Sequence, residues 1–95
     1  MSELCDQIET FGKGIGNATR YKIVEALADG PKSVTELAKI VEVSQPVMSQ
    51  HLKTLKSSNL VTDQRRGQEV IYTVNSKYLL ELIKNLTHAV KKPKS

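Results

Sequence analysis

Apolar residues recur with the spacing of an α-helix in five separate stretches of the chain. The first and last stretches are long stripes, and they comprise Leu4, Ile8, Phe11 and Ile15 near the N-terminus and Leu79, Leu82, Ile83, Leu86 and Val90 near the C-terminus. Positions three and four apart share one face of a helix, so each stripe predicts an amphipathic helix. Three glycines, at positions 12, 14 and 16, weaken the end of the first one.

Three shorter helices are predicted between these ends, each preceded by a residue that caps helix N-termini. The caps are Asn17, then Ser33 or Thr35, then Ser44, which is followed by Pro46 in the first turn, where a missing N–H costs little. Ser33 also has the capping-box spacing with Glu36. The residues predicted to face inward are Ile23, Val24 and Leu27, then Val34, Leu37, Ala38 and Val41, then Met48, Leu52 and Leu55. A short turn joins the last two helices, which predicts a helix-turn-helix over residues 33–57.

The apolar period changes after Asn59. Two runs of β-branched and aromatic residues, 60–62 and 70–74, flank a polar segment at 63–69 that contains a glycine. This pattern predicts a β-hairpin with a charged loop, a wing over residues 60–74, before Asn75 or Ser76 caps the last helix. The predicted fold is therefore mainly α with a small β-hairpin, a winged helix-turn-helix in the order α-α-α-α-β-β-α.

Length and charge add only a little to this picture. The 95 residues fit a single domain, 1–95, and a net charge of +4 is compatible with nucleic acid binding without proving it. The positions of the cations say more, because four of them lie in two short segments predicted to meet on one surface: Lys53, Lys56, Arg65 and Arg66. Residues 91–95 are predicted to form a frayed basic tail.

The cellular compartment is predicted from cysteine usage and hydropathy. Cys5 is the single cysteine, so no intrachain disulfide forms and a reducing cytosol is the expected compartment. The acidic start is unlike a secretory signal, and no apolar run reaches membrane-spanning length. We therefore expect a cytoplasmic protein with no membrane partner.

The predicted helix 45–57 has the make-up of a DNA-recognition helix. Such a helix needs an apolar face toward its own domain, an opposite face of short polar groups, and cations nearby for phosphates. Glutamine suits adenine in the major groove, lysine suits phosphates, and the paired arginines of the wing suit a minor groove or its phosphates. His51 is expected to pack at the domain edge and to bond backbone or phosphate. The residues predicted to contact DNA are Ser44, Gln45, Ser49, Gln50, His51, Lys53, Thr54, Lys56, Arg65, Arg66 and Gln68.

Four motifs over residues 4–90 resemble the ArsR/SmtB repressors. They are Asn17-Ala-Thr-Arg20-x-x-Ile23, Val34-x-x-Leu37-Ala38, Ser44-Gln-Pro-Val-Met-Ser49-Gln-His51-Leu52-x-x-Leu55 and Arg66-Gly67-Gln-x-x-Ile71-Tyr72. The resemblance implies a homodimeric repressor on a palindromic operator of double-stranded DNA, with the helices at 1–16 and 76–90 forming the dimer interface. The apolar residues expected there are Leu4, Ile8, Phe11, Leu79, Leu82, Ile83 and Leu86.

The sensor sites typical of that family are not recognisable in this sequence. Where one site has two cysteines, this chain reads Glu36-Leu37-Ala38-Lys39-Ile40, and of a second site only His88 remains. We therefore predict no metal and no cofactor. Cys5 is predicted to be a partly buried small apolar residue, with an intersubunit disulfide or a modified thiol as the alternative.

Enzymatic functions find no support in the sequence. It offers no nucleophile paired with a base, no phosphate-binding glycine loop after a strand, and no cluster of carboxylates, so we predict that the chain is not an enzyme. Two alternatives to a repressor without a metal sensor stay open. One is a winged-helix module that binds proteins instead of specific DNA, and the other is a thiol-responsive repressor that uses Cys5.

Overall fold

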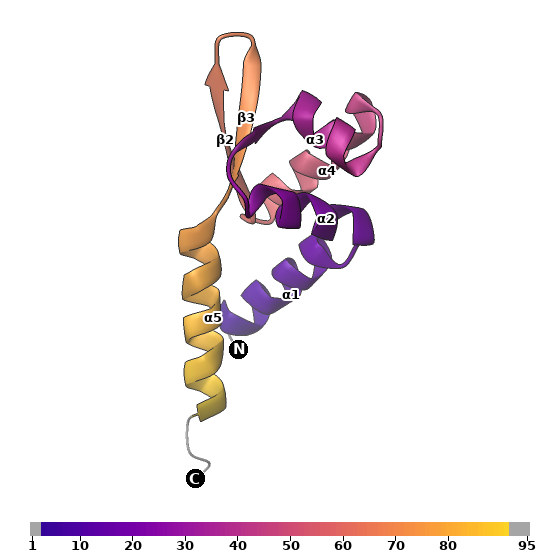
Figure 1. Cartoon of the computed structure of the whole chain (residues 1–95). Helices are drawn as coiled ribbons and strands as arrows, with labels where there is room; N and C mark the ends of the chain where they lie inside the picture. The colour runs from indigo at the N-terminus through magenta and orange to yellow at the C-terminus, as the bar shows by residue number, and fades with distance from the viewer. Residues whose placement is uncertain (1–2, 92–95) are drawn as a thin grey trace.

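The computed structural model describes residues 3–91, which form five helices and a three-stranded antiparallel sheet (Figure 1). The helices are α1 (Glu3–Ile15), α2 (Ala18–Leu27), α3 (Val34–Val41), α4 (Gln45–Ser57) and α5 (Ser76–Lys91). The strands are β1 (Lys32–Ser33), β2 (Val61–Arg66) and β3 (Glu69–Val74). The predicted winged helix-turn-helix is confirmed, with one additional strand.

The additional strand is β1, which the sequence analysis missed. It pairs with β3, Lys32 opposite Tyr72 and Ser33 opposite Ile71, and the sheet order is β1-β3-β2. Two residues are too few to show the alternation by which a strand is recognised, and their partners lie some 40 positions further along the chain. The strand fixes the start of α3 to the base of the wing.

The wing differs from the prediction in the length of its loop. The segment 63–69 was predicted to be a charged loop, but β2 runs to Arg66 and β3 begins at Glu69, so only Gly67 and Gln68 form the turn. Gly67 has a φ of 63°, and the described non-glycine residues with positive φ do not include Gln68. Positive φ at the first turn position alone matches a type II′ hairpin turn, which favours glycine there. Ladder pairing therefore extends through the polar residues, whose side chains are exposed apart from that of the half-buried Asp63.

The core lies between α2, α3, α4 and the base of the sheet. Its fully buried side chains are Ile23, Leu37, Met48, Leu52, Leu55, Leu60 and Val61. The inward face predicted for α4 is confirmed, because its three apolar residues at 48, 52 and 55 are completely buried. Aliphatic side chains from helices and strands together form this core.

The predicted helix caps are also present. Asn17 caps α2, and Ser44 caps α4 by accepting a hydrogen bond from the backbone N–H of Val47. Of the two candidates for α3, Ser33 is the cap, in a complete capping box with Glu36. Asn75, the residue before α5, caps that helix, because its Oδ1 accepts a hydrogen bond from the backbone N–H of Tyr78 at 3.2 Å.

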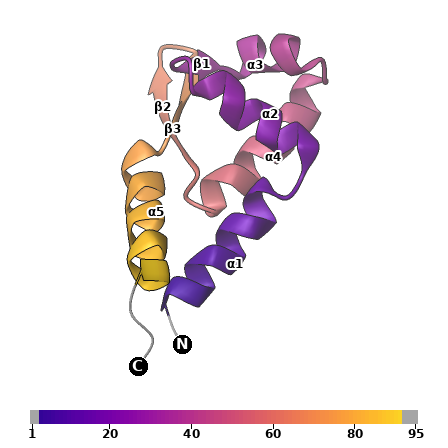
Figure 2. The same cartoon turned by 60° about the horizontal axis from the view of Figure 1, so that its bottom comes forward.

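The molecule is elongated, measuring 54 × 23 × 20 Å. The wing and the helix-turn-helix lie toward one end, whereas α5 and the start of α1 extend toward the other (Figure 1). In the second view α1 and α5 converge like the arms of a V toward the end at which α1 begins (Figure 2). The start of α1 and most of α5 thus extend away from the helix-turn-helix.

The end of α1 packs closely on the turn that follows α4. Gly14 is buried, and a Cβ atom built on it would lie 2.8 Å from Ser58 Oγ and 2.9 Å from Leu60 Cδ1. Arg20 of α2 secures the same helix end by donating from Nε to the carbonyl oxygen of Gly14 at 2.6 Å and from Nη2 to that of Lys13 at 3.0 Å. Gly14 was predicted only to weaken the helix. In the structure, its lack of a side chain allows this close approach.

The start of α5 is attached to the same turn. Asn75 Nδ2 donates to the carbonyl oxygen of Asn59 at 3.1 Å, and the backbone N–H of Asn75 donates to that of Leu60 at 2.9 Å. Asn59 has a φ of 65°, the left-handed conformation that asparagine tolerates better than most residues. Residues 58–60, which directly follow α4 in the chain, therefore contact both long amphipathic helices.

Adding a single methyl group at Gly14 is expected to destabilise the protein by about 1–3 kcal/mol, because the close contacts with Ser58 and Leu60 leave it no room. The matched control is Gly12→Ala in the same helix, where the added Cβ meets nothing within 4 Å. That variant is expected to be neutral or to gain about 0.5–1 kcal/mol from better helix propensity. Urea unfolding of both variants measures the difference. Equal stabilities would contradict the close packing of α1 on the turn.

Candidate nucleic-acid interface

The outer face of α4 is polar and accessible. Apart from Pro46 and Val47, its apolar residues are turned into the core. Ser44 at the cap and Gln45, Ser49, Gln50 and Lys53 on the helix are exposed to solvent. His51 and Thr54 are half-buried, which agrees with the position at the domain edge predicted for the histidine. Most of the residues predicted to read DNA are therefore available to a ligand of this face.

Lys56, also predicted to contact phosphate, already has an anionic partner. Its Nζ lies 3.0 Å from both carboxylate oxygens of Asp63 on β2. The hydrogen bond and the charge of Asp63 raise the pKa of Lys56 above its ordinary value. The pair joins α4 to the wing and places a negative charge beside Lys56, whereas Lys53 is exposed. This ion pair was not predicted from the sequence, because the two residues belong to different predicted elements.

A hollow of about 240 Å³ separates the start of α4 from the wing. Its lining comes from the start of α3, from α4 and from the tip of the hairpin, and comprises Ser33, Val34, Thr35, Gln45, Ser49, Gln68, Glu69 and Val70. Three residues predicted to bind DNA, at positions 45, 49 and 68, thus meet around one space. Thr35 is an addition, since the sequence analysis considered it only as a helix start, and its hydroxyl accepts a hydrogen bond from Gln45 Nε2 at 3.3 Å.

Arg65 and Arg66 lie on β2 and are both exposed. Successive side chains of a strand point to opposite faces, so the two arginines do not point the same way. Arg65 shares a face with Asp63, whose carboxylate bonds Lys56 of α4, whereas Arg66 is on the other face, across the ladder from Glu69. The predicted pair of cations is therefore split between the two sides of the wing.

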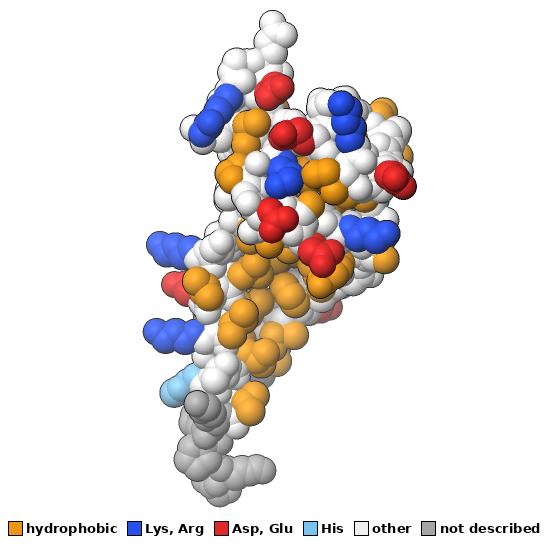
Figure 3. All heavy atoms as spheres, in the orientation of Figure 1, with side chains coloured by type: hydrophobic (Ala, Val, Ile, Leu, Met, Phe, Trp, Pro, Cys, Tyr) orange, Lys and Arg blue, Asp and Glu red, His pale blue; other side chains and the backbone are white. Residues whose placement is uncertain are grey.

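The second prominent surface is an apolar groove between α1 and α5. It encloses about 400 Å³, and its lining consists of Ile8, Phe11, Ile15, Tyr21, Val24, Leu60, Leu79, Leu82, Ile83 and Leu86. In the space-filling view hydrophobic side chains gather over both helices on this face (Figure 3). An exposed apolar surface with so few polar groups is typical of an interaction site.

The residues predicted for a dimer interface differ in their exposure. Ile8, Ile83 and Leu86 are exposed, and Leu4, Phe11 and Leu79 are half-buried. Leu82 is only 5% exposed and packs within the chain, so it offers a partner little surface. Leu80 was missed, although it is 67% exposed beside the stripe on α5.

The candidate sensor residues lie outside any recognisable site. Within residues 3–91 no group of three or more His, Cys, Asp or Glu side chains is arranged to hold a metal ion. His88 is exposed on α5. Cys5 is exposed too, so the prediction that it would be partly buried is wrong for the single chain, because it lies on α1 beside the apolar stripe and not on it.

Of the helices in the described part, none is long and apolar enough to cross a membrane.

Known proteins match this fold and its sequence. Residues 17–63, from the cap of α2 into β2, match the family described as bacterial regulatory protein, arsR family. The transcriptional repressor SdpR of Bacillus subtilis is 31% identical over 80 residues, which cover 84% of this chain and 89% of the relative. The chain belongs to the ArsR family. It spans only 59–60% of the length of three curated HTH-type transcriptional regulators from Mycobacterium tuberculosis.

Solved structures extend the family match to the whole fold. HlyU from Vibrio cholerae aligns with a TM-score of 0.79 at 32% identity and covers 96% of this chain and 98% of its own. A homodimeric winged helix-turn-helix DNA-binding domain from Mycobacterium bovis, described as a possible ArsR-family regulator, aligns with a TM-score of 0.77 at 26% identity, over 95% of this chain and 87% of its own. The long helices α1 and α5 are thus part of the shared ArsR fold.

Proposed function

We propose that this ArsR-family chain is a transcriptional repressor that binds double-stranded DNA as a homodimer in the cytoplasm. The observation that carries the proposal is the exposed polar face of α4 beside an arginine-bearing hairpin, within a chain whose family match covers all of α4 and the start of β2. Among the relatives, SdpR and two arsenical resistance operon regulators are named as repressors and HlyU as an activator, so the proposal takes the role that is more frequent among them. The proposal assigns the chain no catalytic activity.

In this proposal α4 lies in the major groove. Gln45, Ser49 and Gln50 face base edges, where glutamine pairs with the N6 and N7 groups of adenine. Lys53 neutralises a phosphate, and the hairpin β2–β3 reaches the neighbouring backbone or minor groove through its arginines. The polar side chains supply sequence preference, whereas the cations supply affinity that weakens as salt rises.

The homodimer is proposed to form through the apolar groove. A small domain that leaves several large aliphatic side chains exposed on two adjacent helices gains stability when a second copy covers them. Twofold symmetry then presents two α4 helices to a palindromic operator, with half-sites on one face of the DNA about 10 bp, or a multiple of that, apart. The M. bovis relative, a homodimer over most of this fold, supports the arrangement.

The test begins with selection of binding sites from a random DNA pool by the full chain. We expect a palindrome, bound in mobility-shift assays with an affinity that falls steeply between low and physiological salt. Gln50→Ala is expected to lose about tenfold discrimination at one base position in each half-site. Asn85→Ala on α5 is the matched control and should leave the preference unchanged.

Two results would count against the proposal. A Gln50→Ala variant with wild-type preference at every position would show that α4 does not read bases as described. Failure of the wild-type chain to select any sequence would favour the alternative, a winged-helix module that binds proteins.

A further inference from the structure

A side-chain hydrogen bond links the two helices of the helix-turn-helix at their N-terminal ends. Gln45 Nε2, on the first residue of α4, donates to Thr35 Oγ1, on the second residue of α3, over 3.3 Å. Both residues are exposed, and both line the hollow between α4 and the wing. The bond therefore lies on the surface proposed to contact DNA. There the hydroxyl of Thr35 orients the side chain of Gln45, which is proposed to contact a base.

The backbone around this bond is held in place from both sides. Ser33, two residues before Thr35, has its capping box with Glu36 and pairs with Ile71 of the sheet. Ser44, one residue before Gln45, caps α4. Because both caps fix the chain next to the bonded side chains, the distance between Thr35 and Gln45 is set by the fold and not by a flexible loop.

The bond leaves Gln45 with the groups that adenine requires. A glutamine amide has two N–H donors and one carbonyl acceptor, and the bond to Thr35 uses one donor. The remaining N–H and the carbonyl oxygen match N7 and the N6 amino group of adenine. A glutamine held in one orientation also loses less conformational freedom when it binds, so less of the contact energy is spent on ordering it.

We infer that Thr35 is a positioning residue that fixes Gln45 for reading adenine in each half-site. The inference rests on the proposed function, because it requires α4 to lie in the major groove. It assigns a role in sequence preference to a residue of α3 that contacts the reading side chain rather than a base. It also predicts that the hydroxyl, and not the shape, of Thr35 carries the effect.

The test uses the wild-type operator and a set of operators in which each base pair is replaced in turn. Thr35→Val keeps the shape of the side chain and removes the hydroxyl, and it is expected to lose about three- to tenfold discrimination at the adenine position alone. Thr35→Ser restores a hydroxyl and should restore the discrimination. In a Gln45→Ala background, Thr35→Val should have no further effect, because the residue to be positioned is gone.

The outcomes separate this role from others. Equal weakening on every operator, or an effect of Thr35→Val that persists without Gln45, would overturn the inference in favour of a phosphate contact or a helix-stabilising role, and thermal unfolding identifies the latter. A Gln45→Ala variant with wild-type preference throughout would also overturn it, while salt-dependent binding of the selected palindrome would leave the proposed function standing. If the wild-type chain selects no sequence, the proposed function itself fails.

Discussion

Replacing Ile83 with glutamate is expected to convert the proposed dimer into folded monomers and to weaken binding to the palindromic operator by on the order of 100-fold. Ile83 is 58% exposed in the single chain and lies on the rim of the apolar groove, so the change does not disturb the core. Glutamate is also a better helix former than isoleucine. In a twofold interface every substitution occurs twice, and each carboxylate would be desolvated without a partner.

The control for this prediction is Asn85→Glu, which adds the same charge two residues further along α5. Two positions correspond to a rotation of roughly 200° from Ile83, and Asn85 is exposed and is not among the residues that line the groove, so the new carboxylate stays in water. Sedimentation equilibrium measures the association state of both variants, and mobility shifts on whole and half operators measure the loss of bivalent binding. An Ile83→Glu variant that dimerises like the wild type would place the interface on another surface.

Local sequence signals predicted most of the fold. The helices and their starts follow from apolar spacing and from capping residues such as Ser33 and Asn17, whose hydrogen bonds reach only three residues ahead. The inward face of α4 follows from the same spacing. These features were predictable because each depends on residues within one or two helical turns of the chain.

The features that the sequence did not reveal depend on contacts between distant residues. Strand β1 exists only through its pairing with β3, and the ladder through Arg66 and Glu69 makes strand out of residues with a polar, loop-like composition. The ion pair of Lys56 with Asp63 and the hydrogen bond of Gln45 to its partner on α3 likewise join separate elements. Spacing along the chain says nothing about such contacts until the elements are placed in space.

The turn at 58–60 shows how such contacts serve the proposed function. A dimer sets the distance between its two recognition helices only if each α4 is rigidly attached to the helices of the interface. Gly14 at the end of α1 packs against this turn, and Asn75 at the start of α5 donates hydrogen bonds to its carbonyl groups. Because the turn directly continues α4, the packing of these three helices would set the spacing of the half-sites in the proposed dimer.

Removing both arginines of the wing is expected to weaken DNA binding by about 30-fold at about 0.15 M salt, and removing one by about fivefold. The estimate follows from counterion release. For each phosphate that the protein neutralises, the binding constant falls with about the 0.9 power of the salt concentration. The slope of log affinity against log salt should fall by about 0.9 for Arg65→Ala or Arg66→Ala and by about twice that for the double variant. The loss should be the same for all DNA sequences.

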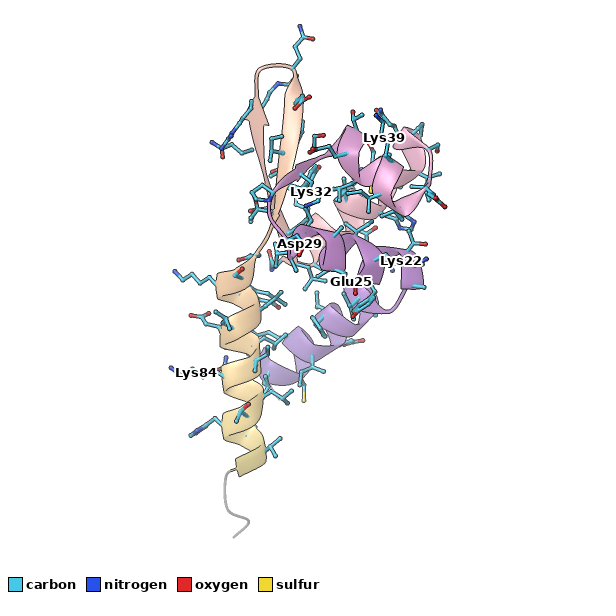
Figure 4. The ribbon with its side chains drawn as sticks, in the orientation of Figure 1. Lys22, Glu25, Asp29, Lys32, Lys39 and Lys84 are labelled. Atoms are coloured by element: carbon cyan, nitrogen blue, oxygen red, sulfur yellow. The ribbon has the colours of Figure 1, made fainter. Side chains whose placement is uncertain are left out.

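Lys84→Ala is the control for charge alone, because its ammonium group extends outward from α5, remote from the wing (Figure 4). It removes one positive charge and should leave the salt slope unchanged. A wild-type slope for the double variant would refute the wing as a phosphate-binding element.

The two single variants also decide how the hairpin meets DNA. Arg65 and Arg66 point to opposite faces of β2, so a hairpin that lies flat on one backbone brings only one of them to phosphate. A hairpin that stands edge-on in a groove has a backbone on each side and uses both. Equal losses for the single variants therefore indicate that the hairpin inserts into the groove, with each arginine at the phosphates of one strand. A loss confined to Arg65, which shares its face with the Asp63–Lys56 pair, indicates a wing that lies along the backbone next to α4.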